Sequence, residues 1–200
     1  MSATERANSM SEERSVWRVC GIAGSLRQSS YNRVILRAAQ ELAPSGLVIK
    51  IFDGLNEVPL FNQDLAASGD PPGVSVLKEA IRGADALLIA TPEYNGGIPG
   101  VLKNALDWAS RVGSEPESAL SGKPTAIFGA SPGRLGTARA QPQLRLALES
   151  SGVFVMPKPE VHLMSISGHV TDGVLVDETA RRTITSLMEA FRHWISQVHV

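Results

Sequence analysis

Short apolar runs alternate along the chain with segments whose apolar residues recur at helical spacing. Five runs have the length and the apolar or β-branched content of buried strands, at residues 16–23, 47–52, 84–90, 124–129 and 153–156. Five segments carry an apolar stripe at helical spacing, at residues 31–42, 74–82, 99–109, 144–151 and 177–195. Strand and helix are therefore expected to alternate from residue 16 onward.

Residues at the ends of these segments agree with that division. Pro99 suits the first turn of a helix, Gly152 suits the end of one, and Asp177 is a fitting cap for the last helix. Pro142 does not fit a helix interior, so we expect its helix to start or kink there. Residues 53–73 are rich in Pro and Gly and are expected to be irregular.

Five strands alternating with five helices predict an α/β fold, with a parallel sheet between two helix layers and right-handed crossovers. Length and element order fit a flavodoxin-like three-layer sandwich with strand order 2-1-3-4-5 better than a full dinucleotide-binding fold. We expect one domain over residues 16–200. Residues 1–15 are polar, lack the apolar core of a secretory signal, and are expected to form a disordered leader.

Composition narrows the function classes. The chain has 200 residues, 43% of them hydrophobic, which is enough for the core of one domain. Its 19 basic and 20 acidic residues nearly cancel, which argues against nonspecific binding to nucleic acid or membranes. The single cysteine, Cys20, excludes intrachain disulfides and cysteine-rich zinc sites and favours a cytoplasmic location. Because it lies in an apolar segment, we expect a buried structural thiol rather than a nucleophile.

Ligands of such sheets bind beyond the carboxyl ends of the strands, so the loops after the first, third and fourth strands form the candidate site. The first loop, residues 24–32, offers three serine hydroxyls, an Arg, an Asn and a helix N-terminus, which together can surround a phosphate. The alternative is a Ser cap on an ordinary turn. The loop lacks the ending of a Walker A motif and the glycines of a dinucleotide fingerprint, so a monophosphate is favoured.

The other two loops are also unusual. Prolines and glycines in residues 91–100 fix a bend at which a flat ring can approach the backbone, with Tyr94 and Asn95 beside it. A stiff turn before a helix is the alternative there, and a flexible turn is the alternative for residues 129–141. The four histidines, His162, His169, His193 and His199, lack metal-ligand spacing, and we expect no metal site and no acid–base residue.

The three loops together resemble the NADPH-dependent FMN reductase family, which includes quinone, chromate and azo-dye reductases. The resemblance rests on Gly-Ser-Leu-Arg-x-x-Ser-x-Asn at residues 24–32, Pro-Glu-Tyr-Asn at 92–95, Pro-Gly-x-Leu-Lys-Asn-Ala-x-Asp-Trp at 99–108, and Gly-Thr-x-Arg-Ala-Gln at 136–141. It runs in order from about residue 19 to residue 160. Pro142, and Gly96 with Gly97 in place of a bulky side chain, depart from the family and leave subunit contacts and substrate range open.

The resemblance implies which residues hold FMN. The phosphate would be held by Ser25, Arg27, Ser30, Tyr31 and Asn32. The isoalloxazine would be lined, mostly by backbone, by Pro92, Glu93, Tyr94, Asn95 and Gly96, with Ser131 and Gly133 on the other side. Glu93 is equally compatible with a solvated carboxylate that does not contact the flavin.

The resemblance also implies an activity. NADPH or NADH would pass hydride through FMN, in a ping-pong cycle, to a quinone, free flavin, chromate or azo compound. The alternative is a nonenzymatic electron carrier or regulatory FMN-binding module. Relatives form homodimers and homotetramers, and Val101, Leu106 and Trp108 could supply an interface or belong to the core. Residues 15–40 and 118–148 each hold four basic residues and no acid, so the small net charge conceals a basic rim.

Overall fold

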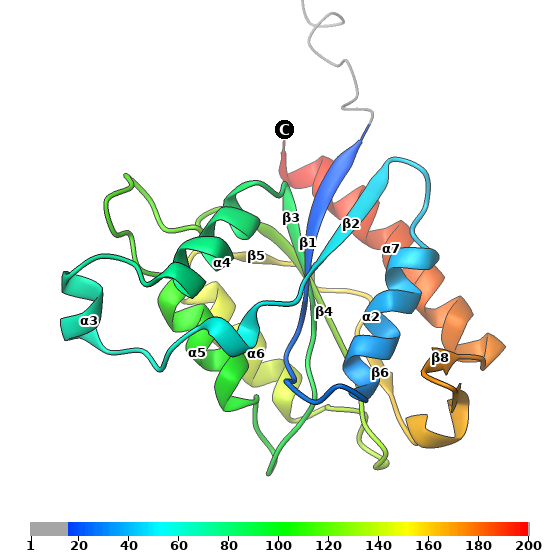
Figure 1. Ribbon diagram of the computed structural model, residues 1–200. Helices are drawn as coiled ribbons and strands as arrows, with labels where there is room; N and C mark the ends of the chain where they lie inside the picture. The colour runs from blue at the N-terminus through cyan, green and yellow to red at the C-terminus, as the bar shows by residue number, and fades with distance from the viewer. Residues whose placement is uncertain (1–15, 200) are drawn as a thin grey trace, which may run out of the picture.

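A computed structural model describes residues 16–199 as a central sheet with helices on both faces (Figure 1). The strands of the sheet are β1 (Trp17–Ala23), β2 (Leu47–Phe52), β3 (Ala86–Ala90), β4 (Pro124–Ala130), β5 (Phe154–Val155) and β6 (Val161–Leu163). The main helices are α2 (Tyr31–Glu41), α4 (Pro72–Arg82), α5 (Gly100–Ala109), α6 (Ala140–Glu149) and α7 (Glu178–Val198). The predicted alternation of strand and helix is confirmed.

The sheet is parallel and has the order β2-β1-β3-β4-β5, as the sequence predicts. The prediction of five strands is wrong by one, because β6 is a sixth. β5 pairs with Pro124 and Thr125, whereas β6 pairs with residues 128–130 farther along β4. Pro157 and Pro159 separate β5 from β6, and a proline has no N–H to donate to a strand ladder. The edge strand is therefore broken into two short pieces.

Each face of the sheet has its own core. Helices α2 and α7 cover one face of the sheet and lie to its right in Figure 1, and α4, α5 and α6 cover the other face and lie to its left. Every residue of β3 and β4 is buried, which explains their unbroken apolar sequences. Cys20 is 3% exposed, and burial raises the pKa of its thiol to about 12. The predicted structural thiol is confirmed in the fold.

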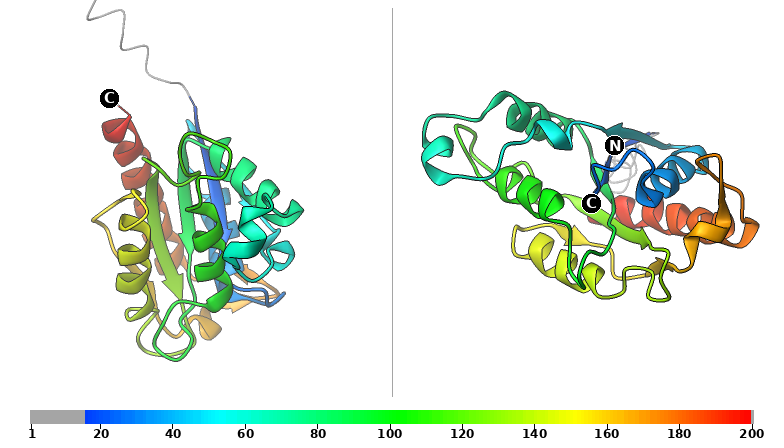
Figure 2. Two further views of the ribbon diagram at one scale, coloured as in Figure 1. Left: turned by 90° about the vertical axis from the view of Figure 1, so that its left-hand side faces the viewer. Right: turned by 60° about the horizontal axis from the view of Figure 1, so that its bottom comes forward.

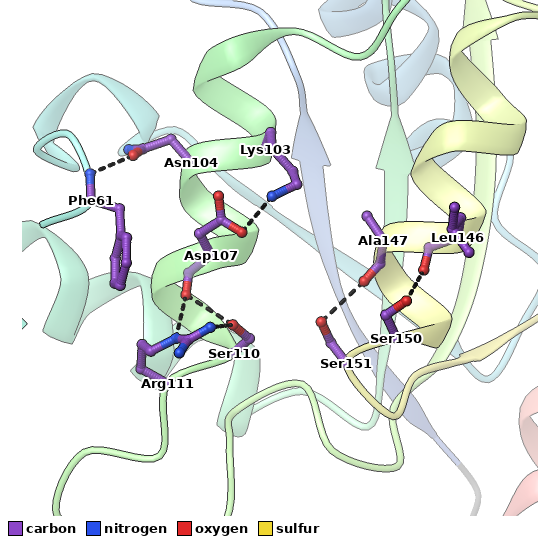
Figure 3. A network of polar contacts seen from close by, with 10 residues as sticks. All are labelled: Phe61, Lys103, Asn104, Asp107, Ser110, Arg111, Leu146, Ala147, Ser150 and Ser151. Carbon is purple, nitrogen blue, oxygen red and sulfur yellow. Dashed lines mark hydrogen bonds and ion pairs between the residues drawn. The ribbon is translucent and has the colours of Figure 1, made fainter. Parts of the chain in front are cut away.

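Helix α5 is anchored by its polar residues as well as by its apolar stripe. Asn104 accepts a hydrogen bond from the Phe61 backbone N–H (2.7 Å) and donates one to the Pro59 carbonyl (2.8 Å), which also accepts from the Trp108 indole (2.9 Å). The Asn104–Phe61 contact is drawn in Figure 3. Leu106 and Trp108 are buried in the core, so these two cannot supply a subunit interface. The Asn and Trp of the sequence motif thus hold the segment before α3 (Gln63–Ala67).

Two helix starts test the capping predictions. Asp177 caps α7, and its Oδ1 accepts from the Ala180 N–H at 2.7 Å. Helix α6 begins at Ala140 rather than at residue 142 or 144, and Pro142 lies in its first turn. A proline is tolerated there because the N–H groups of the first turn have no intrahelical acceptor.

Short elements were not predicted. They are η1 (Leu55–Glu57) and α3 within the irregular stretch, and η2 (Ile166–His169), β7 (Val170–Thr171) and β8 (Val174–Leu175) before α7. No helix in residues 16–199 is long and apolar enough to cross a membrane. The predicted leader, residues 1–15, lies outside the described residues, as does Val200.

Candidate active site

The loops after β1, β3 and β4 emerge from the same edge of the sheet, at the bottom of Figure 1, and face the viewer in the right-hand view of Figure 2. Side-chain contacts tie each of them to another. Ser25 of the first loop meets Tyr94 of the second, with the two hydroxyl oxygens 3.0 Å apart. Asn32 bonds to the end of β4, and Glu93 bonds to the start of α6. The predicted site residues are therefore brought together as one rim.

The first loop forms a cradle of unbonded backbone donors. Ser30 is the N-cap of α2, and its hydroxyl accepts from the Asn32 N–H at 3.2 Å, while Ser25 accepts from the Arg27 N–H at 3.3 Å. Four further N–H groups have no hydrogen-bond acceptor among residues 16–199, those of Leu26, Gln28, Ser29 and Tyr31. Donors clustered at a helix N-terminus favour an anion, and the fit is that of a phosphate group.

Arg27 supplies a positive charge at the same place. Its guanidinium donates to the Ser29 carbonyl at 3.1 Å and lies over the Tyr31 ring, 5.5 Å from the centroid. Within the described chain it forms no ion pair with a carboxylate, so its charge is not neutralised there. The residue is exposed, and a bound phosphate would gain a charge-assisted partner.

Asn32, which is predicted to hold the phosphate, bonds through its side chain to the end of β4. Its side chain is buried, its Nδ2 donates to the Ala130 carbonyl and its Oδ1 accepts from the Ala130 N–H, both at 3.0 Å. The amide thus spans from the start of α2 to the end of β4. We infer that Asn32 positions the first and third loops relative to each other.

The second loop closes in a tight hairpin turn. Tyr94 and Gly97 exchange two backbone hydrogen bonds of 3.0 Å, and Asn95 and Gly96 between them have φ values of 52° and 78°. Positive φ at both central positions is the pattern of a type I′ turn, for which Asn-Gly is the preferred pair. The N–H groups of Glu93, Asn95 and Gly96 have no acceptor within residues 16–199. Pro92, two residues before this turn, is buried.

Glu93 is not a solvated carboxylate. Its side chain is 7% exposed and pairs with the Arg139 guanidinium, at 2.7 Å from Nε and 2.5 Å from Nη2. It also accepts from the backbone N–H of Arg139 (2.9 Å) and of Ala140 (3.2 Å). Desolvation alone would raise the pKa of this carboxyl, but the hydrogen bonds and the charge of Arg139 outweigh it and hold the pKa below its ordinary value. The Glu93 side chain therefore bonds to the start of α6 and not to solvent.

The third loop begins at Gly129, a position of β4 where a side chain would not fit. A Cβ built on Gly129 would lie 2.2 Å from Thr137 Oγ1 and 2.4 Å from the Thr91 carbonyl oxygen. Beyond it, the Ser131 N–H bonds to the Leu163 carbonyl (3.1 Å) and its hydroxyl donates to the Gly133 carbonyl (3.3 Å). Ser131 therefore shapes the loop and reaches the unpredicted strand β6.

Sequence reasoning missed two residues of this rim. Arg139 and Gln143, both from the start of α6, contact the second loop, and Gln143 Nε2 donates to the Gly96 carbonyl at 2.8 Å. Arg139 stands in the quoted Gly-Thr-x-Arg-Ala-Gln motif, so that motif was the available clue for it. No motif in the sequence indicated a role for Gln143.

Two cavities lie away from the rim. One of about 590 Å³, between β2 and α4, is mostly apolar and includes Cys20. Another of about 300 Å³, beside α6, has a mixed polar and apolar lining that includes Arg145, Glu160 and His162. Neither is lined by a predicted site residue, so neither changes the location of the candidate site.

Comparisons with known proteins identify the family of the chain. Residues 17–167 match the model of the family described as NADPH-dependent FMN reductase. An NAD(P)H-dependent FMN reductase of Pseudomonas aeruginosa is 48% identical over 182 residues, covering 90% of this chain and 96% of the relative. A quinone reductase of Pseudomonas putida is 38% identical over 182 residues, with 90% and 95% coverage.

A solved structure gives the same result. The flavoenzyme FerB of Paracoccus denitrificans, an NAD(P)H:(acceptor) oxidoreductase, superposes with a TM-score of 0.81 at 35% identity, covering 91% of this chain and 98% of that one. The flavodoxin-like fold and the family resemblance of the three loops are both confirmed. The chain belongs to the NADPH-dependent FMN reductase family and is an FMN-dependent NAD(P)H oxidoreductase.

Proposed function

We propose that the protein is an NAD(P)H:quinone oxidoreductase whose FMN lies on the rim formed by the three loops. The observation that carries this proposal is the phosphate cradle, where four N–H groups without an acceptor in residues 16–199 belong to the same short loop as the Arg27 guanidinium, which forms no ion pair in that range. Ser25, Ser30 and Tyr31 complete the cradle, and Asn32 holds it against β4. The quinone reductases among the relatives support the choice of acceptor.

The second and third loops would receive the ring. The N–H groups of Glu93, Asn95 and Gly96 are available as donors, and Ser131 and Gly133 border the opposite side. When bound, FMN supplies the redox chemistry, in which hydride from the nicotinamide reaches the flavin and electrons leave to the acceptor. Donors held in place before reduction stabilise negative charge as it develops on the ring, which is the contribution we assign to this backbone.

We propose that the nicotinamide and the electron acceptor react with the flavin in ping-pong order, and that the acceptor is a small molecule. Nicotinamide and acceptor would use the same exposed face of the ring, so the first must leave before the second enters. Quinones come first among the acceptors, and free flavin, chromate and azo compounds are further candidates. The three loops, residues 24–32, 91–100 and 129–141, carry Arg27, Arg134 and Arg139 and a single acid, Glu93, whereas an electron carrier needs an acidic docking face, and this disfavours the nonenzymatic alternative.

We further propose a homodimer or homotetramer in the cytoplasm. Leu60 and Leu65, before and within α3, are 83% and 40% exposed, and a second copy would cover them. The single buried thiol suits a reducing compartment. Light scattering of the purified protein decides the assembly, and a monomer would contradict that part of the proposal.

Steady-state kinetics test the proposed reaction. NADPH and NADH oxidation should be measured with a benzoquinone, with free FMN, with chromate and with an azo dye. We expect the benzoquinone to give the largest kcat/KM, with parallel double-reciprocal lines as a ping-pong order requires. Intersecting lines would contradict the order, and absence of turnover with the benzoquinone would contradict the acceptor.

A further inference from the structure

Glu93 is the most heavily bonded side chain on the rim. The carboxylate accepts from the Arg139 side chain and from two consecutive backbone N–H groups, those of Arg139 and Ala140. Arg139 is the N-cap residue of α6, and its own side chain supplies no cap. A residue of the second loop, 46 positions earlier in the chain, therefore caps this helix.

A second contact reinforces the first. Gln143, one turn into α6, donates to the Gly96 carbonyl at 2.8 Å. Its Oε1 lies 3.2 Å from the position that a Cβ on Gly97 would occupy, so the glutamine is packed closely against the turn. Glu93, which directly precedes the hairpin turn, and Gly96, one of its two central residues, are thus both fastened to the start of α6.

The position of this pair of contacts bears on the flavin. The turn they fasten contains the unbonded N–H groups of Asn95 and Gly96, and Tyr94 in the same turn contacts Ser25 of the phosphate cradle. In the Glu93–Arg139 ion pair, the Arg139 side chain is 61% exposed and the Glu93 side chain only 7%, so Glu93 is the buried partner. Fixing the turn before the ring arrives removes ordering entropy from the binding step.

We propose that Glu93 and Gln143 are positioning residues that hold the turn 94–97 in the shape that receives the isoalloxazine. This rests on the proposed flavin site and assigns a role to two residues that need not touch the flavin through their side chains. The competing explanation is a helix cap that serves only the stability of α6.

Matched variants separate these explanations. Glu93→Ala removes both the cap and the ion pair, Glu93→Gln keeps a neutral acceptor, and Gln143→Ala removes only the contact with Gly96. Asp177→Ala is the control, because Asp177 caps α7 through the same kind of carboxylate bond, to the Ala180 N–H. Each apoprotein should be titrated with FMN by flavin fluorescence, its Tm measured, and hydrogen exchange followed at the Gly97 amide, which bonds to the Tyr94 carbonyl.

We expect Glu93→Ala to weaken FMN binding about tenfold or more, because charge-assisted hydrogen bonds are lost, with partial rescue in Glu93→Gln. Gln143→Ala, whose side chain is on the surface, should fold normally and weaken binding about threefold, near the value of one neutral hydrogen bond. Exchange at Gly97 should rise in all three, and Asp177→Ala should lower Tm while leaving FMN affinity and Gly97 exchange unchanged.

Two results would overturn the proposal, and they differ. If the wild type binds FMN and the Glu93 and Gln143 variants bind it within about twofold of the wild type, the contacts serve α6 alone. If the wild type takes up no FMN, the proposed flavin site fails, and the positioning role fails with it.

Discussion

The side-chain amide of Asn32 makes two hydrogen bonds of 3.0 Å with the backbone of Ala130, although the two residues are 98 positions apart. One residue belongs to the first turn of α2 and the other ends β4. Both groups of the Ala130 backbone are buried, so they depend on this amide rather than on water. The distance between the phosphate cradle and the third loop is thereby set by one side chain.

Asn32→Ala is expected to destabilise the apoprotein by about 2–3 kcal/mol, because two hydrogen bonds are lost and two buried backbone groups remain unsatisfied. Urea unfolding followed by circular dichroism measures the change. Asn56→Ala is the control, since that exposed amide bonds only to the neighbouring Glu57 side chain and should matter by less than about 0.5 kcal/mol. Equal effects of the two variants would contradict the role given to Asn32.

Arg27→Ala should separate flavin binding from stability. The residue is exposed and its ion pair would form only with bound phosphate, so we expect about a 10- to 100-fold loss of FMN affinity with little change in apoprotein Tm. Arg37→Ala removes an equal charge from an exposed position of α2, the helix that follows the Arg27 loop. If Arg37→Ala weakens FMN as much as Arg27→Ala does, the effect is long-range charge rather than contact.

Gly129 and Gly100 should respond oppositely to alanine. At Gly129 a Cβ would overlap Thr137 and the Thr91 carbonyl, so Gly129→Ala should cost about 2 kcal/mol or more. At Gly100, the first residue of α5, no atom lies within 4 Å of the added Cβ, and alanine should be neutral or stabilise by a few tenths of a kcal/mol. Thermal unfolding of both variants checks this. Tolerance of Ala at 129 would show that β4 and the second loop lie farther apart than described.

Glu93 should give the stability a characteristic pH dependence. Although desolvation opposes it, the bonds from Arg139 and α6 lower the pKa of this carboxyl in the folded protein. The carboxylate therefore stabilises the fold fully above its unfolded-state pKa, and the gain is lost as pH falls through the lower folded-state value. The Tm difference between wild type and Glu93→Gln should be constant from about pH 7 to 5 and shrink below about pH 4. A Tm difference between wild type and Glu93→Gln that grows as the pH falls would contradict a lowered pKa of Glu93 in the folded protein.

Local pattern was enough to predict the scaffold and the three loops. The bounds of β2 were predicted without error, and α7 was found from its apolar stripe and the Asp177 cap. The missed strand β6 has three residues and follows two prolines, so it lacks the length and alternation that define a strand in sequence. Its existence depends on the free edge of β4, which is a tertiary property.

The contacts between loops could not be predicted. Whether Glu93 is solvated or bound to α6 depends on a residue 46 positions away, and Asn32 bonds to backbone, whose position no side-chain pattern reveals. The sequence shows which residue types suit a phosphate, but which of them bind it and which position the loops depends on contacts in the folded structure.

Anaerobic titration shows whether FMN bound to this protein carries electrons from NADPH to a quinone. The wild-type protein should be loaded with FMN, separated from free flavin by gel filtration, and titrated with NADPH and then with benzoquinone while the flavin absorption band is recorded. We expect FMN to remain with the protein, its band to be bleached by one equivalent of NADPH, and the band to return with one equivalent of the quinone. FMN that separates from the protein, or a bound band that NADPH leaves unchanged, would contradict this role of FMN.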